Sequence, residues 1–302
     1  MKHKLLVSLL ALATASIAAV GFTACGESNN QLKLSYELKD NTYTVKGTSS
    51  VPDGEYAIEI PSTYQDLPVT EIAFEAFKGH DGATSVTIPE SVTKILRNAF
   101  YNCKDLKTIN LPDSLTSISP EAFFGTAYYE NASNWTSGVL YIGNHLIKAK
   151  DTITGSYSVK AGTLCIAYEA FYNCTALTGV TISNSVTTIG ASAFKGCSGL
   201  TSVTIPGSVN LIDFGAFSGC SGLTSVTISN GAKSIGKMAF EKCNALTSVS
   251  LPNSITYIGN GAFSVSDVYY AGTIQEWNNI EKDSNCISAS HYTIHCSDGD
   301  TN

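Results

Sequence analysis

Charged residues, and basic clusters in particular, are scarce in this sequence. Only 14% of the 302 residues are Asp, Glu, Lys or Arg, the net charge is −7, and no basic run occurs after Lys4. A surface that binds nucleic-acid phosphates needs clustered Lys and Arg, so we exclude nucleic acid as a partner. The hydrophobic content of 43% is sufficient for a core, and so little charge argues against a disordered chain.

Catalytic motifs are also missing. The sequence has no His-Glu-x-x-His helix, no glycine loop that would hold a phosphate, and no Gly-x-Ser-x-Gly elbow. Its Asp and Glu residues are scattered, without a paired arrangement that would place two carboxylates in one pocket. We therefore predict no enzyme activity, no catalytic residues, no metal and no cofactor.

The chain has no apolar run long enough to span a membrane, because Leu5–Val20 covers only about 16 residues where roughly 20 are needed. This run fits a signal peptide. Phe22 is bulky at the position three before Cys25, and Phe-Thr-Ala-Cys resembles a bacterial lipobox. We predict a signal peptide over 1–24, lipidation of Cys25 and a polar tether over 25–31. The alternative is plain secretion, with the Cys25 thiol unused.

A strict repeat occupies most of the chain. Ala-Phe pairs recur at one constant spacing, except for a gap of slightly more than two repeats between Phe123 and Phe171. Such a period indicates stacked supersecondary units, each unable to fold alone. The repeated phenylalanines are Phe77, Phe100, Phe123, Phe171, Phe194, Phe217, Phe240 and Phe263.

One clear repeat runs from Leu200 to Cys220. Leu200, Val203 and Ile205 follow the L-x-x-L-x-L spacing of leucine-rich repeats, which places alternate residues on one face of a strand. Phe217 comes later, on a short helical or 3₁₀ turn that points inward. We predict a mainly β, right-handed leucine-rich-repeat solenoid of about nine turns of ~23 residues, with a parallel sheet on one face and short helical or 3₁₀ turns on the other.

The units LTSVTIPGSV and AFSGCSGLTSVTIS closely resemble the BspA-like, treponemal-type leucine-rich repeats of bacterial surface proteins, over about residues 36–282. The opening YELKDNTYTVKG and the closing VYYAGTIQEWNNI resemble that family's cap and shortened last repeat. The resemblance implies surface display, adhesion to proteins such as those of the host matrix, and no catalysis. The expected segments of the 32–302 solenoid are a cap with the first repeat (32–75), repeats (76–127), an irregular insert (128–166), regular repeats (167–263), and a closing repeat with a tail (264–302).

Outward positions of the C-terminal strands carry small hydroxyl side chains in register. Adjacent strands lie about 4.8 Å apart, so these residues would form a flat hydrogen-bonding ladder. The alternative is that Ser and Thr simply suit solvent-facing strand positions. The candidate binding face is Thr181, Ser202, Thr204, Ser225, Thr227, Ser248 and Ser250.

The insert supplies a second candidate site, because insertions in solenoids map to loops that often lie on a binding face. Its aromatic residues suit recognition, and the alternative is that they pack the irregular turn. The candidate contacts are Tyr128, Tyr129, Trp135 and Tyr141.

Cysteine recurs three residues after the repeated phenylalanine, at positions such as Cys197 and Cys220. We interpret this column as buried packing thiols, with disulfides or a metal ladder as alternatives. Near the C-terminus, Cys286 and Cys296 could form a disulfide. Together with His291 and His295 they could instead bind zinc, although the spacing matches no standard module, or form neither.

We therefore predict a cell-surface, extracytoplasmic lipoprotein that binds a protein partner, either a host matrix protein or another cell-surface protein. Its lipid anchor would attach it to the membrane. The alternatives are a carbohydrate-binding surface component, for which a glycan is the ligand, and a structural envelope protein without a specific ligand.

Overall fold

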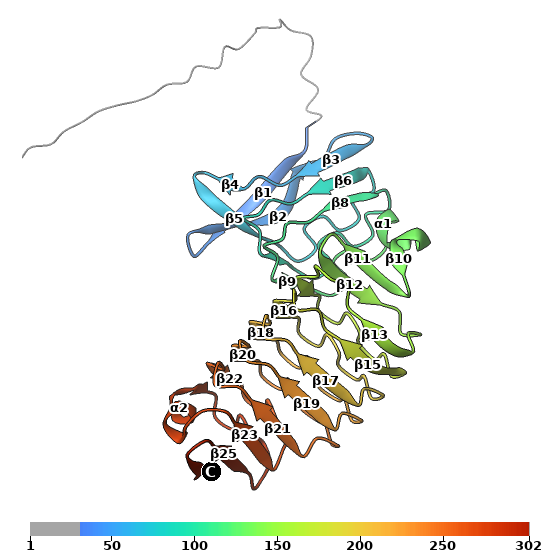
Figure 1. Ribbon diagram of the computed structural model, residues 1–302. Coiled ribbons are helices and arrows are strands. Elements are labelled where there is room, and N and C mark those ends of the chain that lie inside the picture. Colours follow the sequence, from blue (N-terminus) through green and yellow to red (C-terminus); the bar gives the residue numbers. More distant parts are fainter. Residues whose placement is uncertain (1–30, 302) are drawn as a thin grey trace, which may run out of the picture.

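The computed structural model describes residues 31–301, and it confirms a mainly β leucine-rich-repeat solenoid (Figure 1). The signal peptide over 1–24, Cys25 and all of the tether except Gln31 lie outside the described residues. The solenoid has about 11 turns rather than the nine that we predicted, because the cap and the closing segment add turns without a repeated phenylalanine.

The N-terminal cap covers the first turn with a hairpin of β1 (Lys33–Lys39) and β2 (Thr42–Ser50). β2 pairs in parallel with β5 (Leu67–Ile72), which continues the sheet into the first short repeat strand and also pairs with the short antiparallel β4 (Thr63–Tyr64). Val45 of β2 is fully buried against the first repeats, so the hairpin seals this end of the apolar core.

Each regular turn carries two strands, and the prediction of one parallel sheet is therefore incomplete. The L-x-x-V-x-I segment forms the longer strand, and the second apolar pair forms a strand of two residues. The longer strands are β3 (Tyr56–Glu59), β6 (Ala83–Thr87) and β8 (Thr108–Asn110) in one sheet, and β13 (Gly155–Ser158), β15 (Leu177–Thr181), β17 (Ser202–Ile205), β19 (Ser225–Ile228), β21 (Ser248–Leu251) and β23 (Asp267–Tyr270) in another.

The short strands stack in the same way on a second side of the solenoid. Their inward residue is a buried isoleucine in most turns, such as Ile212. On either side of the insert, but not across it, each strand pairs with the equivalent strand of the next repeat. These strands are β7 (Lys94–Ile95), β9 (Ser117–Ile118), β14 (Cys165–Ile166), β16 (Thr188–Ile189), β18 (Leu211–Ile212), β20 (Ser234–Ile235), β22 (Tyr257–Ile258) and β24 (Glu281–Lys282).

The Ala-Phe segments form tight turns, so the predicted helical or 3₁₀ turns are wrong for the regular repeats. The backbone is left-handed two residues before and two residues after the phenylalanine, for example at Ser192 (φ 54°) and Gly196 (φ 76°). A right-handed helix cannot continue through such residues. The backbone instead bonds to the next turn, as where Phe194 N–H donates to the carbonyl oxygen of Ala216 at 2.7 Å.

The phenylalanine rings point inward and stack along the axis, as predicted. Neighbouring rings lie 4.9–5.4 Å apart at interplanar angles of no more than 8°. The cysteine three residues later is a buried free thiol, which supports the packing interpretation. In four turns its S–H donates to the phenylalanine carbonyl of the preceding turn, as from Cys197 to Phe171 at 3.1 Å.

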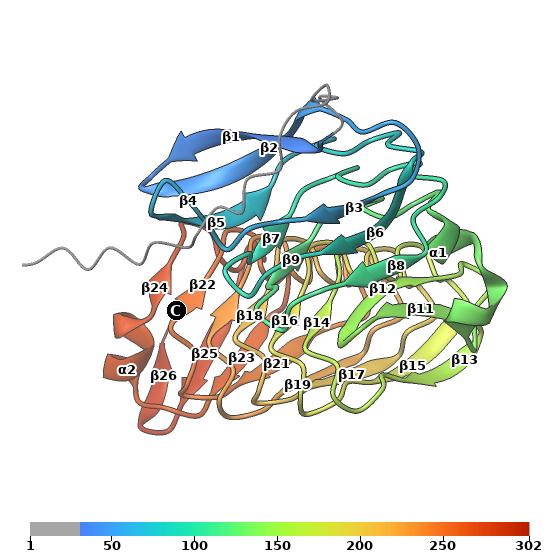
Figure 2. The same cartoon turned by 90° about the horizontal axis from the view of Figure 1, so that it is seen from above.

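The stack of rings is interrupted at the insert. Here α1 (Ala127–Glu130) and the 3₁₀ turn η1 (Ala132–Asn134) lead into an antiparallel β10 (Trp135–Thr136), β11 (Val139–Ile142) and β12 (His145–Ala149). No phenylalanine fills the space between Phe123 and Phe171. The core accordingly divides into two clusters that meet at β11, and the strands change direction there (Figures 1 and 2).

The closing segment ends the solenoid at the end opposite to the cap (Figure 1). α2 (Ile274–Asn279) begins with a capping box between Thr273 and Glu276 and buries Trp277. β25 (Thr293–Cys296) pairs with β23 and then turns into the antiparallel β26 (Gly299–Thr301). The candidate Cys286–Cys296 disulfide is not formed. Both are free thiols, with Cys286 beside Phe263 in the turn column and Cys296 in the long-strand sheet.

Candidate binding surfaces

The hydroxyl ladder lies where we predicted it. Ser202 pairs with Ser225 and Thr204 with Thr227 on adjacent strands, and all four side chains are exposed while Val203 beside them is buried. The row continues to Ser250, the partner of Thr227, and Thr181 lies beside Thr204 at the other end. Ser248 is half-buried. The outward side chains along these strands are uncharged.

The ladder ends at a cluster that the sequence analysis missed. Tyr269 lies next to Ser250 and is 49% exposed, and its ring stacks on that of His295 with centroids 4.7 Å apart. The His295 ring nitrogens lie 3.0 Å from Asp267 and 3.0 Å from Asp300, and these two carboxylates raise the pKa of His295. The repeat length did not predict these residues on the ladder. Asp267 pairs with Ser248, but it follows Ser248 in the sequence by less than one full repeat.

The four candidate aromatics of the insert take two different roles. Tyr128 donates its hydroxyl hydrogen bond to the carbonyl oxygen of Tyr141 at 3.1 Å, and the Tyr141 hydroxyl lies 3.0 Å from that of Tyr157. Both side chains are half-buried, so Tyr128 and Tyr141 chiefly hold the irregular turn together. Trp135 donates its indole N–H to the carbonyl oxygen of Tyr129 at 2.7 Å, but these two rings also border a surface depression.

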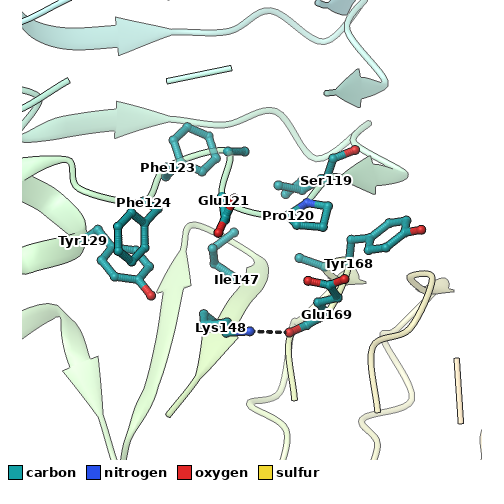
Figure 3. A pocket seen from close by; sticks show the side chains of 13 residues that line it. Ser119, Pro120, Glu121, Phe123, Phe124, Tyr129, Ile147, Lys148, Tyr168 and Glu169 are labelled. Atoms are coloured by element: carbon teal, nitrogen blue, oxygen red, sulfur yellow. Dashed lines mark hydrogen bonds between the residues drawn. The ribbon is translucent and has the colours of Figure 1, made fainter. Parts of the chain in front are cut away.

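Two adjoining depressions lie where the phenylalanine stack is interrupted. The smaller, of about 170 Å³, opens between the last turn before the insert and the first regular turn after it (Figure 3). The larger, of about 460 Å³, lies over β12, and both are bordered by Tyr129 and Lys148. The smaller depression is lined by Ile118, Ser119, Pro120, Glu121, Ala122, Phe123, Phe124, Tyr129, Ile147, Lys148, Ala167, Tyr168 and Glu169.

Aromatic rings form a continuous strip beside these depressions. We use the name aromatic strip for Tyr101, Phe124, Tyr129 and Trp135, whose successive ring centroids are 5.5, 5.1 and 5.1 Å apart. Lysine ammonium groups lie over the two end rings, Lys78 at 5.8 Å from Tyr101 and Lys150 at 5.2 Å from Trp135. The strip therefore combines large apolar area with flanking positive charge.

Three of the aromatic residues on this side escaped the sequence analysis although their spacing marks them. Tyr101, Phe124 and Tyr172 each follow directly after a repeated phenylalanine. The side chain at this position faces outward, and Phe124 and Tyr172 are 39% and 37% exposed. An aromatic residue directly after an Ala-Phe pair is therefore the sequence signal that identifies all three.

Lys148 extends from β12 into the wall shared by the two depressions. Its ammonium group donates to the backbone carbonyl oxygen of Glu169 at 2.7 Å, and burial lowers the pKa of Lys148 (Figure 3). No ion pair joins it to a carboxylate anywhere in residues 31–301. The nearby Glu121 carboxylate is paired with Arg97 at 3.2 Å instead. Lys148 is therefore a half-buried cation with donor capacity left over.

Two further features concern metals and membranes. Within the part of the chain that the structure describes, no group of three or more His, Cys, Asp or Glu side chains is arranged to hold a metal ion. None of the helices in residues 31–301 is both long and apolar enough to pass through a bilayer.

Solved structures with related folds come from several bacteria. A leucine-rich cell surface protein of Faecalibacterium prausnitzii is 23% identical, with a TM-score of 0.48, and covers 88% of this chain and 100% of its own. The leucine-rich-repeat protein of Treponema pallidum is 28% identical over 70% of this chain and 87% of its own, with a TM-score of 0.35. The pneumococcal vaccine antigen PcpA is 18% identical over 88% and 97%, with a TM-score of 0.43. No curated protein matches the sequence.

A family model gives the clearest comparison. The BspA-type leucine-rich repeat region matches in six copies, over residues 57–157 and 165–291, which is well over half of the chain. Proteins with these repeats are typically bacterial surface proteins, and the family and its solenoid fold are in general non-enzymatic. The interruption of the match, over 158–164, lies in the insert where the regular turns are broken. The chain belongs to the BspA-type leucine-rich repeat family.

Proposed function

We propose that this protein is a lipid-anchored adhesion protein of the bacterial surface, which binds a protein partner and catalyses no reaction. The observation that carries the proposal is the aromatic strip beside two adjoining depressions. Protein interfaces obtain most of their affinity from a few aromatic and arginine side chains packed into pockets. An exposed Phe124 next to a depression gives a partner both an apolar contact and a recess to fill.

The arrangement along the solenoid supports surface display. The predicted lipidated residue, Cys25, is six positions before Gln31, where the described chain enters the cap. The aromatic strip begins at Tyr101, in the turn of the second repeated phenylalanine, and ends in the insert, and more than half of the described residues lie beyond it. An anchor before the cap would hold the strip near the middle of a rigid rod, away from the membrane.

The proposal is tested by measuring binding of the mature protein to a panel of purified host matrix proteins and bacterial surface proteins by biolayer interferometry. Phe124→Ser combined with Tyr172→Ser removes two exposed rings without touching the core. We expect this variant to lose at least tenfold in affinity, since an interface anchor contributes about 2 kcal/mol or more.

Phe214→Ser is the matched control for this experiment. Phe214 is 43% exposed, also on the Ala-Phe side, and lies outside both depressions. Its loss should leave affinity unchanged. Equal binding by the double variant and the wild type would refute the strip and the adjoining depressions as the site. A lack of saturable binding to any panel member would favour a structural envelope role.

A glycan is the second candidate ligand, favoured by the exposed Tyr269 at the end of the hydroxyl ladder. One face of the Tyr269 ring stacks on His295, which leaves the other face toward Ser250 for a sugar ring. In this case a glycan array should give binding that Tyr269→Ala abolishes and Tyr269→Phe retains. Loss of the same signal in the Phe124 and Tyr172 double variant would assign the glycan to the strip and the adjoining depressions instead.

A further inference from the structure

The smaller depression contains two charged groups of opposite sign that form no ion pair within residues 31–301. Lys148 donates one hydrogen bond to a backbone oxygen and contacts no carboxylate. The Glu169 side chain likewise has neither an ion pair nor a hydrogen bond in the described chain, although its charge acts on Lys148 from a distance and opposes the effect of burial on the lysine pKa. The third charge of the depression, on Glu121, forms an ion pair with Arg97 and also acts on Lys148 from a distance. One cation and one anion therefore border the same cavity without touching each other.

We propose that this depression binds a zwitterionic ligand of amino-acid size, with the ligand carboxylate on Lys148 and its ammonium group on Glu169. A ligand with only a carboxylate would meet the repulsion of Glu169, and a ligand with only an amine would meet that of Lys148. A zwitterion satisfies both charges at once. Charge-assisted hydrogen bonds of this kind are stronger than neutral ones, and partial burial reduces their screening by salt.

The remaining walls define the rest of the ligand. Phe123 and Ile147 form an apolar base that belongs to the interrupted core, and Phe124 and Tyr168 are aromatic walls (Figure 3). The volume of about 170 Å³ suits one small organic molecule and not a long peptide. These features favour an α-amino acid with an apolar side chain, such as leucine, valine or phenylalanine.

The cavity exists because of the insert. In regular turns the phenylalanine of the next turn stacks directly on each repeated phenylalanine, with ring centroids 4.9 Å apart. At the insert no phenylalanine follows Phe123, and Ile147 and Lys148 occupy that part of the wall. The same interruption thus creates the space and places a cation at its edge.

The experiment is isothermal titration of the full mature protein with L-leucine, N-acetyl-L-leucine and L-leucinamide. The acetyl compound lacks the ammonium group and the amide lacks the carboxylate. We expect saturable 1:1 binding of leucine and at least tenfold weaker binding of both analogues. Lys148→Met and Glu169→Gln should each weaken the binding of leucine by a similar factor, and Lys148→Arg should retain binding.

Lys150→Met is the matched control, because Lys150 lies two residues from Lys148 and does not border the smaller depression. Its leucine affinity should equal that of the wild type, and circular dichroism and melting curves check that each variant folds. The proposal is overturned if no amino acid binds the folded wild type, or if either analogue binds as tightly as leucine. The two proposals share this depression, because Phe124 lines it, but their tests are separate. Titration with leucine measures the small ligand alone, and Lys148→Met leaves the Phe124 and Tyr172 rings in place for the adhesion assay.

Discussion

The thiol of Cys220 lies 3.1 Å from the carbonyl oxygen of Phe194 in the preceding turn, to which it donates a hydrogen bond. The same oxygen accepts the backbone N–H of Cys197 at 3.2 Å. Cysteine suits this position because it is small and apolar yet still has a hydrogen to donate. The column of thiols thus joins neighbouring turns without any covalent link.

The buried thiols should be chemically inert in the folded protein. Burial raises the pKa of Cys197 and that of Cys243 to about 12, so almost no reactive thiolate forms at pH 8. We expect iodoacetamide to leave both unmodified until the protein is unfolded in guanidinium. Peptide mapping by mass spectrometry measures this, and the less buried Cys286 and Cys296 should react first. Rapid native labelling of Cys197 would contradict the packing that we describe.

The phenylalanine stack should be essential for folding of the neighbouring turns. Phe217 is fully buried between Phe194 and Phe240. Phe217→Asp places a charge in a dry core, where even truncation to alanine costs about 3–5 kcal/mol. We expect a large loss of melting temperature and of amide protection in adjacent turns. The control is Phe214→Asp, three residues earlier and exposed, which should change the melting temperature little.

The lipid anchor is a prediction from residues that the structure does not describe. Growth of the producing cell with a radioactive fatty acid should label the protein, and Cys25→Ala should abolish the label. Labelling that persists in the variant would refute lipidation of Cys25. Recovery of the wild type from the medium without label would instead support plain secretion.

The closing hairpin should depend on pH through His295. Hydrogen bonds with Asp267 and Asp300 raise the pKa of His295, so its stabilising contribution is complete below the unfolded pKa of about 6.5 and disappears as pH rises through the raised value. Ser266 and His295 lower the pKa of Asp267, whose contribution is lost only as pH falls through that lowered value. The hairpin of β25 and β26 is therefore most stable between these two pKa values.

Hydrogen exchange measures this dependence. Amides of β26, corrected for the intrinsic effect of pH, should be better protected near pH 5.5 than near pH 8.5. His295→Gln should remove the difference, while the amides of β17 should show the same protection at both values. A hairpin that is equally protected at both pH values in the wild type would contradict the role of His295.

The sequence was sufficient for the parts of the fold that repeat. The constant spacing of Phe194, Phe217 and Phe240 predicted both the turn length and the inward rings. It did not reveal the second sheet, because strands of two residues such as Thr188–Ile189 are too short for an alternating pattern. Nor did it reveal the left-handed turns, since Glu169 and Ser192 occupy positions where a residue other than glycine with positive φ is uncommon.

The candidate sites were harder to predict than the fold. Outward Ser202 and Thr204 followed directly from alternation along a strand. Lys148 and Glu169 lie on either side of the end of the irregular insert, so no period relates them, and only the three-dimensional arrangement places both at one cavity. Tyr128 and Tyr141 were predicted as contacts because they are aromatic and lie in an insert. These two criteria do not distinguish a side chain that packs inside the protein from one that is free to contact a ligand.

The two core clusters have a consequence for how damage spreads along the protein. Val139 belongs to the C-terminal cluster and Leu140, the next residue, to the N-terminal one, and β12 is divided in the same way between Leu146 and Ile147. The boundary between the two apolar interiors therefore lies at β11 and β12. In a solenoid each turn is stabilised chiefly by its neighbours, and local unfolding passes from turn to turn. At β11 and β12 the apolar contacts between neighbouring turns are divided between two clusters. Proteolysis or oxidation that opens the closing repeats would thus halt at the insert and spare the N-terminal repeats.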